Sequence, residues 1–213
     1  MLSCAISNEL DGKGAGFGQR FFSQICGGDL FTLFPKGAIP TALEYEDRYL
    51  ATPIACALLV DVVSAVKAQF QARGDWGDVP IQVTTMTIEG GKQSRSRGTW
   101  WSDWEFTDQR DMALKAAFDY SGMPASIVTK EKRFLGHGRR LTLWFASGGK
   151  LCLWLDQGWS YWAVAKLHRQ TPLAAFDMRL PATVLGEALA EFRIDVQGHE
   201  LPTQVFVDLR ELP

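Results

Sequence analysis

The sequence lacks the motifs that would assign it to a catalytic class. No serine lies in a Gly-x-Ser-x-Gly turn, no His-Glu-x-x-His pair occurs, and no two of the four cysteines form a Cys-x-x-Cys pair. A Walker A loop is missing too, because Lys13 in the glycine-rich residues 12–18 is followed by glycine instead of serine or threonine. Hydrolase, zinc and nucleotide sites are therefore not indicated, and no cofactor is expected.

The chain also lacks a long uninterrupted apolar run. The longest, residues 54–66, is broken by Asp61 and is shorter than the roughly 20 residues that a membrane-spanning helix needs. The first residues show neither a cationic start nor a hydrophobic segment, which argues against a secretory signal. The widely spaced cysteines are typical of buried thiols in a reducing compartment. These features predict a cytoplasmic protein that does not contact a membrane.

Hydrophobic periodicity predicts a mixture of helices and strands. Apolar residues recur at helical spacing between Ile54 and Phe70, with Thr52 as a cap and Pro53 in the first turn. Further helices are predicted over residues 108–120, capped by Thr107, and 181–192. Alternating or β-branched segments predict strands over residues 80–88, 125–129, 140–146, 151–156, 159–165 and 203–209.

The order of these elements predicts one α+β domain over residues 1–213, with an antiparallel sheet or meander and helices packed on one side. Tight glycine turns at residues 147–150 and 157–158 favour the meander. Residues 1–50 are rich in loop-forming residues and are a candidate subsidiary lobe.

Positive charge is concentrated in the middle of the chain. The whole sequence has 22 Lys and Arg against 24 Asp and Glu, a formal charge of −2. Residues 92–140 contain ten Lys and Arg against six Asp and Glu, a net of +4, which leaves 12 against 18, a net of −6, elsewhere. A basic face on an acidic protein is typical of a chain that binds a polyanion beside other protein subunits.

Two basic runs in this region predict a nucleic-acid interface. Glycine and serine keep residues 90–98 from burying themselves, and adjacent tryptophans follow, which cannot both face inward on an extended strand. If residues 125–129 and 140–146 are neighbouring strands, their connection places the second run on the same rim. The predicted contacts are Lys92, Arg95, Arg97, Trp100, Trp101, Lys130, Lys132, Arg133, His137, Arg139 and Arg140.

The other tryptophans and the acidic residues have plainer interpretations. Trp144, Trp154, Trp159 and Trp162 fall in the predicted meander and are expected to pack structurally. Asp108 and Asp111 lie at the start of a predicted helix, where their charge favours the helix dipole. No metal site is predicted.

Two alternatives from other classes stay open. His137, with Arg139 or Arg140 to stabilise a charged phosphorane, has the residue types of an endoribonuclease. The apolar residues 31–35 are alternatively the docking segment of a protein-interaction module that makes no nucleic-acid contact.

Cys26-Gly27-Gly28 is followed some thirty residues later by Cys56-Ala57, which opens a helix, and then by a mixed basic and aromatic remainder. This arrangement resembles the small Cas8-like subunit of type IV CRISPR effector complexes. The resemblance implies a noncatalytic subunit of a bacterial ribonucleoprotein in antiviral defence, which sits at one end of a guide RNA and touches target DNA near the protospacer-adjacent motif. That family commonly pairs cysteines around such positions to hold zinc, whereas Cys26 and Cys56 each stand alone.

These observations give one leading hypothesis. The chain is a noncatalytic subunit of a ribonucleoprotein complex, and its partners are RNA, duplex DNA or both, together with other protein subunits.

Overall fold

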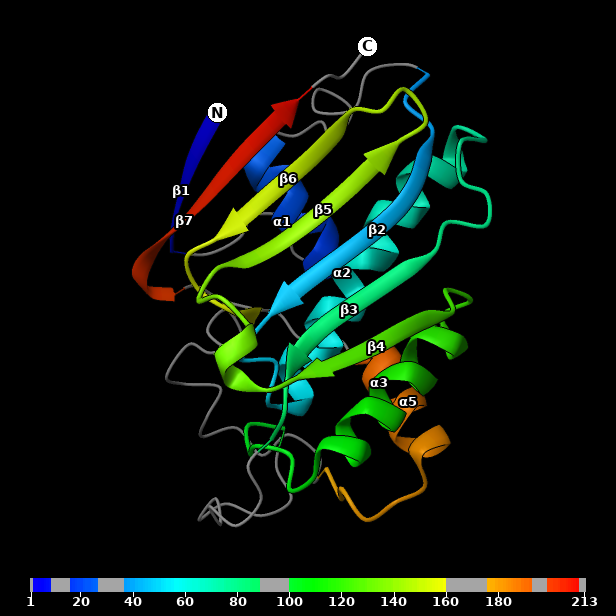
Figure 1. Ribbon diagram of the computed structural model, residues 1–213, viewed down its shortest axis with the longest axis vertical. Helices are drawn as coiled ribbons and strands as arrows, with labels where there is room; N and C mark the ends of the chain where they lie inside the picture. The colour runs from blue at the N-terminus through cyan, green and yellow to red at the C-terminus, as the bar shows by residue number, and fades with distance from the viewer. Residues whose placement is uncertain are drawn as a thin grey trace.

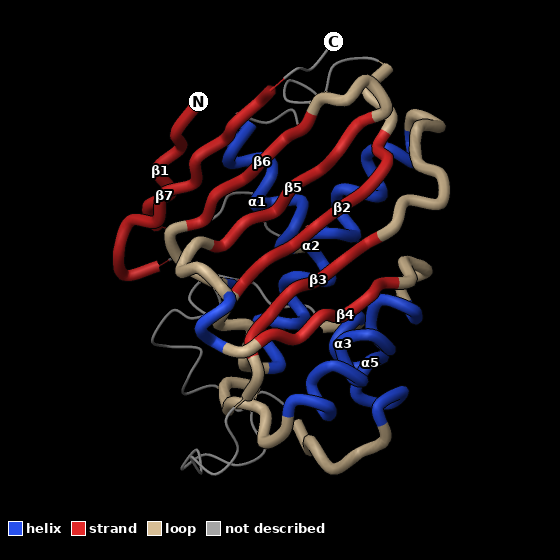
Figure 2. The backbone as a smooth tube through the Cα atoms, viewed as in Figure 1, coloured by secondary structure: helices blue, strands red, loops and turns tan. Residues whose placement is uncertain are grey.

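The computed structural model describes residues 2–8, 16–26, 37–88, 100–159, 176–192 and 199–210, which form one mixed sheet with helices against a single face (Figure 1, Figure 2). The sheet has seven strands in the order β1-β7-β6-β5-β2-β3-β4. The strands are β1 (Leu2–Asn8), β2 (Pro40–Asp47), β3 (Ile81–Met86), β4 (Ala125–Lys130), β5 (Arg139–Phe145), β6 (Lys150–Leu155) and β7 (His199–Arg210). The helices are α1 (Phe17–Cys26), α2 (Pro53–Ala72), α3 (Thr107–Tyr120) and α5 (Ala182–Ala190), with a short 3-10 helix, η2 (Lys132–Phe134).

The sheet consists of a parallel part and an antiparallel part. Strands β2, β3 and β4 run parallel to one another, and helices α2 and α3 make the two crossovers between them. Strand β5 is antiparallel to β2, and the remaining pairs, β5 with β6, β6 with β7 and β7 with β1, are antiparallel as well. The predicted α+β class with helices on one side of the sheet is confirmed; the sheet is mostly antiparallel, and its parallel part was not predicted from the sequence.

Helix α2 is the centre of the core. The Thr52 side chain accepts a hydrogen bond from the Ala55 amide at 3.3 Å, and Pro53 occupies the first turn, as the sequence predicts. The helix is long and apolar enough to cross a membrane, but 67% of its apolar window is buried inside the domain. It is therefore a core helix, and it packs against α1, α3 and α5.

Alternation along the strands divides the sheet into a packed face and an open face. Leu141, Leu143 and Phe145 of β5 point into the core with the helices, whereas the residues between them point away. The same alternation holds in β6, where Leu151, Leu153 and Leu155 are the core residues. Figure 1 shows that α1, α2, α3 and α5 lie behind the sheet, so none of these four helices covers the open face.

Glycines let the helices approach each other closely. A Cβ on Gly18 of α1 would lie 2.4 Å from the backbone oxygen of Asp61 on α2, and the Gly18 amide donates to the Asp61 carboxylate at 2.9 Å. A Cβ on Gly186 of α5 would lie 2.5 Å from Cβ of Ala116 on α3. Both contacts exclude a side chain at these positions.

Several local predictions need correction. Residues 1–50 contain β1, α1 and β2, and β2 lies inside the sheet, between β5 and β3. Thr107 does not cap α3, because Phe106 is the N-cap residue and the Thr107 hydroxyl instead accepts from the Ile88 amide at 2.9 Å. Most of the strand expected over residues 159–165 lies outside the described residues, and the division into a domain and a subsidiary lobe stays a prediction.

The close contact of α3 with α5 predicts the effect of a single methyl group. Gly186→Ala places a methyl against the α3 backbone, and overpacking of this kind costs about 1–3 kcal/mol. We expect a lower free energy of unfolding in urea. Gly77→Ala is the matched control, because a Cβ there meets nothing within 4 Å. Equal stability of the two variants would contradict the close packing of these helices.

Candidate nucleic-acid interface

The parallel strands bring three chain segments to one edge of the sheet. Because β2, β3 and β4 are parallel, their C-terminal ends lie at the same edge, where ligands bind in many open α/β sheets. We call this the carboxyl edge. It consists of residues 47–49 after β2, residues 87–88 after β3, and residues 131–138 after β4.

The second basic run crosses this edge. The sequence analysis considered β4 and β5 as neighbouring strands. They are not neighbours, because β2 and β3 lie between them. Residues 131–138 must therefore pass the ends of β3 and β2 to reach β5, and η2 forms on the way (Figure 1). Lys130, Lys132, Arg133 and His137 are exposed along this path. The error moves the basic run from a hairpin loop to the carboxyl edge.

The exposed cations of the connection are not held in strong ion pairs among the described residues. Arg133 pairs with Glu131 at 2.9 Å, but its side chain remains 71% exposed, so water screens the pair. Residues 130–140 contain five Lys and Arg and one Glu, a net of +4. This part of the edge is therefore strongly positive.

A buried arginine without an acidic partner lies beneath the connection. Arg48 is only 8% exposed, and its Nη1 atom lies 2.9 Å from Nε2 of His137. No carboxylate pairs with Arg48 within the described part of the chain, and its buried Nε atom has no hydrogen-bond partner there. Burial of a charge without a counterion is costly. Sequence reasoning missed this residue, because a single arginine between Asp47 and Tyr49 carries no pattern.

The contact with Arg48 fixes the role of His137. Nη1 of Arg48 lies 2.9 Å from Nε2 and 3.4 Å from Nδ1 of His137, and because a guanidinium can only donate, the ring nitrogen that faces it acts as the acceptor. Nδ1 also lies 3.3 Å from the Tyr49 hydroxyl. An acceptor nitrogen that a general base needs is therefore engaged by Arg48, and this contact does not favour the endoribonuclease alternative.

Asp47 forms a second buried group beside Arg48. Its carboxylate is fully buried, accepts from the Tyr45 hydroxyl at 2.8 Å and the Tyr49 amide at 2.7 Å, and lies 3.6 Å from Nε of Arg139. Burial raises the pKa of Asp47 above its ordinary value of 3.8, and the two hydrogen bonds and Arg139 offset part of that rise. Burial, followed by the nearby Asp47 carboxylate, raises the pKa of Tyr45 well above 10.0.

Two predicted contact residues are thus partly committed to structure. Arg139 faces Asp47, and its Nη1 atom donates to the Asp156 carbonyl at 2.6 Å. The backbone of Gly158 closes over this pair, since a Cβ there would lie 3.0 Å from both Arg139 and Asp47. Arg140 lies 3.7 Å from Glu46 and stacks at 5.3 Å over the Trp154 ring.

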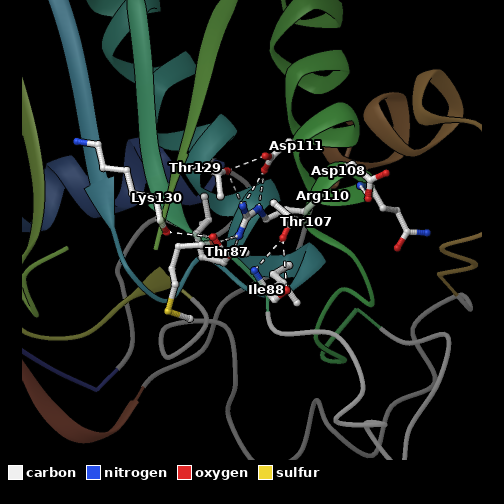
Figure 3. A network of polar contacts seen from close by, with 11 residues as sticks. Thr87, Ile88, Thr107, Asp108, Arg110, Asp111, Thr129 and Lys130 are labelled. Atoms are coloured by element: carbon white, nitrogen blue, oxygen red, sulfur yellow. Dashed lines mark hydrogen bonds and ion pairs between the residues drawn. The ribbon is translucent and has the colours of Figure 1, made fainter. Parts of the chain in front are cut away.

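Arg110 holds the ends of β3 and β4 together (Figure 3). Its guanidinium is 1% exposed and donates to the Met86 carbonyl at 2.7 Å and to the Thr129 hydroxyl at 3.1 Å. Asp111 neutralises it at 2.8 Å and also accepts from Thr129 at 2.7 Å. Asp111 therefore acts as the counterion to a buried arginine, and Asp108 is the acidic residue in the first turn of α3.

The described residues that flank the first basic run lie near the same edge. Lys92, Arg95 and Arg97 lie outside the described residues. On one side of them, Ile88 binds Thr107, as Figure 3 shows. On the other side, the Trp100 carbonyl accepts from the Ile54 amide at 3.1 Å, at the start of α2. Both flanking residues therefore belong to the region where β2 and β3 end.

The structure places the two predicted tryptophans differently from each other. Trp100 is 8% exposed, and its ring packs against Phe176 at 4.5 Å and Phe192 at 4.2 Å. Trp101 is half-buried against the same core. The Trp100 ring is therefore occupied by core packing and is not available to stack on a base.

The described cysteines and carboxylates are not grouped as metal ligands. Cys56 and Cys152 are free, buried thiols, and burial raises the pKa of Cys56 to about 12. Across the described ranges, no group of three or more His, Cys, Asp or Glu side chains is placed to hold an ion.

The fold and edge together define an open-faced α+β domain with a basic rim and no motor motif. A family model for the C-terminal domain of the DEAD/DEAH box helicase YjiV matches residues 2–209, and the chain belongs to that family. No curated protein and no solved structure matches it. This membership overturns the CRISPR resemblance and with it the ribonucleoprotein subunit in antiviral defence, because the matched family covers nearly the whole chain.

The buried Asp47 carboxyl predicts a pH dependence. The folded state holds this proton more tightly than the unfolded state, so its contribution is fully present below about pH 3.8 and is lost as the pH rises through the raised pKa. In urea titrations from about pH 4 to about pH 8, we expect Asp47→Asn to gain stability relative to the unmodified chain as the pH rises.

Asp177→Asn is the control with the opposite sign. Hydrogen bonds from Arg179 lower the pKa of Asp177 to about 2, so its contribution is present above its ordinary pKa of 3.8 and is lost as the pH falls toward 2. The stability difference for Asp177→Asn should therefore stay nearly constant from about pH 4 to about pH 8 and change only when the pH is lowered further. A stability difference for Asp47→Asn that stays constant or shrinks as the pH rises would contradict the raised pKa of Asp47.

Proposed function

We propose that this chain is a non-motor domain of a DEAD/DEAH-box helicase and that its carboxyl edge binds nucleic-acid phosphates. The family supplies the helicase context. The sequence contains no Gly-Lys-Ser or Gly-Lys-Thr, so ATP hydrolysis would belong to a motor outside this chain, in the cytoplasm. The domain itself would not be catalytic, and its partners would be nucleic acid and that motor.

The observation that carries the proposal is the unpaired charge of Arg48. A folded domain keeps a buried cation without an acidic partner only at a cost in stability, and such residues are concentrated at functional sites. A phosphate would supply the missing anion. Arginine suits this role, because its planar fork of donors matches phosphate geometry.

The exposed cations above Arg48 support the same ligand. Lys130, Lys132 and Arg133 lie on the connection that crosses the edge, and His137 links this connection to Arg48. A polyanion along the edge would therefore meet exposed cations first and the buried guanidinium behind them. Such contacts release counterions, which makes affinity depend on salt.

A salt titration tests the exposed cations. Lys132→Gln with Arg133→Gln removes two charges, so the slope of log affinity against log salt should become shallower by about 1.4 on single strands and about 1.8 on duplex. Arg73→Gln with Lys115→Gln removes two charges from the helical layer, where each has an acidic partner, and should leave the slope unchanged. Equal effects of the two double variants would reject the edge as the binding surface.

Arg48→Met separates binding from stability. Because the change removes a buried, uncompensated charge and keeps a side chain of similar length, the free energy of unfolding should stay equal or rise, while nucleic-acid affinity falls about fivefold or more. Urea unfolding and fluorescence anisotropy measure the two quantities. A loss of stability larger than about 1 kcal/mol with unchanged affinity would identify Arg48 as a structural residue instead.

A further inference from the structure

The open face of the sheet carries large aromatic side chains. Solvent-facing strand positions are usually polar, yet Trp144 on β5, Trp154 on β6 and Phe206 on β7 all point away from the helices. Trp154 is 37% exposed. Exposed apolar surface of this kind on a folded domain marks a binding surface more often than a structural need.

Cations accompany both tryptophans. The Arg140 guanidinium lies 5.3 Å from the Trp154 ring centroid, and the Lys150 ammonium lies 4.7 Å from that of Trp144. In the ladder between β5 and β6, Arg140 is opposite Trp154 and Trp144 is opposite Lys150. The two strands therefore present two pairs, each of one cation and one indole, on the same face.

The two pairs enclose a small polar centre. Thr142 and Cys152 lie opposite each other between them, and each is only 4% exposed although both point to the open face. The Thr142 hydroxyl donates to the Cys152 Sγ atom at 3.7 Å. The result is a continuous aromatic and cationic strip along β5 and β6, which we call the tryptophan strip, defined by Arg140, Trp144, Lys150 and Trp154.

The tryptophan strip continues directly from the carboxyl edge. Gly138, the last residue of the connection before β5, lies against the Trp154 ring, since a Cβ there would be 3.2 Å from its Cζ3 atom. Arg140 follows two residues later. A nucleic-acid strand bound at Lys132 and His137 would therefore reach Trp154 over a continuous surface.

Acidic residues border the strip on both sides. Glu44 and Glu46 of β2 lie beside β5, where Glu46 pairs with Arg140, and Asp208 of β7 lies opposite Cys152. Strands β5 and β6 themselves contribute no acidic side chain between Arg139 and Leu155. The charge pattern favours one narrow polyanion track along β5 and β6 over a broad basic surface.

We propose that single-stranded nucleic acid leaves the carboxyl edge along the tryptophan strip, with one base stacked on Trp154 and phosphates beside Arg140 and Lys150. The proposal rests on the proposed function of the edge and extends it. Bases in a duplex are stacked on each other and cannot reach an indole, whereas a single strand offers them, so the strip selects unpaired strands.

Trp154→Ala tests the stacking on a 15-nucleotide oligothymidylate. Removal of a stacking aromatic should weaken single-strand binding about tenfold, while affinity for a duplex of the same length changes by less than about twofold. Trp154→Phe keeps an aromatic face and should restore most of the single-strand affinity. Tyr120→Ala removes an exposed aromatic from α3, on the opposite side of the sheet, and should have no effect.

Salt dependence separates this proposal from the one on which it rests. The slope for Trp154→Ala should equal that of the unmodified chain, because no charge is removed, whereas Lys150→Gln should make it shallower by about 0.7. Unchanged single-strand affinity in Trp154→Ala, with the edge variants still altering the slope, overturns the strip and leaves the edge standing. Absence of binding to either oligonucleotide overturns both.

Discussion

The carboxyl edge depends on the buried guanidinium of Arg110. Three parallel strands end there, and buried backbone carbonyls at strand ends need hydrogen-bond donors. Arg110 donates to the carbonyl of Met86 on β3 and the hydroxyl of Thr129 on β4, and Asp111 balances its charge from the same helix. Because the donors of one planar group are fixed relative to each other, the ends of β3 and β4 and the start of α3 hold one geometry.

Arg48 lies at the same edge and differs from Arg110 in one respect. Both side chains are more than nine-tenths buried, but Arg110 has a carboxylate at 2.8 Å and Arg48 has a histidine. A neutral imidazole can accept a hydrogen bond, but it does not cancel the charge. Arg110 also donates to the Leu50 carbonyl at 3.5 Å, two residues after Arg48. The contrast between a compensated and an uncompensated charge is the physical basis for assigning structure to Arg110 and binding to Arg48.

Sequence patterns predicted most helices and strands well, but they did not predict which strands lie next to each other in the sheet. The helix after Thr52 and the strands at residues 125–130 and 139–145 follow from periodicity, because local spacing alone determines which residues can be buried. The insertion of β2 and β3 between β4 and β5 does not, because pairing depends on contacts between residues far apart in sequence. Arg48 and Asp47 were missed for the same reason: their significance comes from His137 and Arg139, about ninety residues away along the chain. Trp154 was expected to pack structurally, because alternation places it on one face of the sheet but does not show which face the helices leave open; the proposed binding role rests on the placement of α1, α2, α3 and α5 on the opposite side.

One-sided layering connects the edge to the open face. Two structural requirements apply at the start of β5. Residues 131–138 must cross the strand ends, and β5 must then point alternate side chains toward the helices. Leu141 satisfies the second requirement, which directs Arg140 to the open face beside Trp154. A shift of one residue in the register of β5 would bury Arg140 and expose Leu141. The hydrophobic pattern that builds the core therefore also determines that the basic connection and the tryptophan strip form one continuous surface.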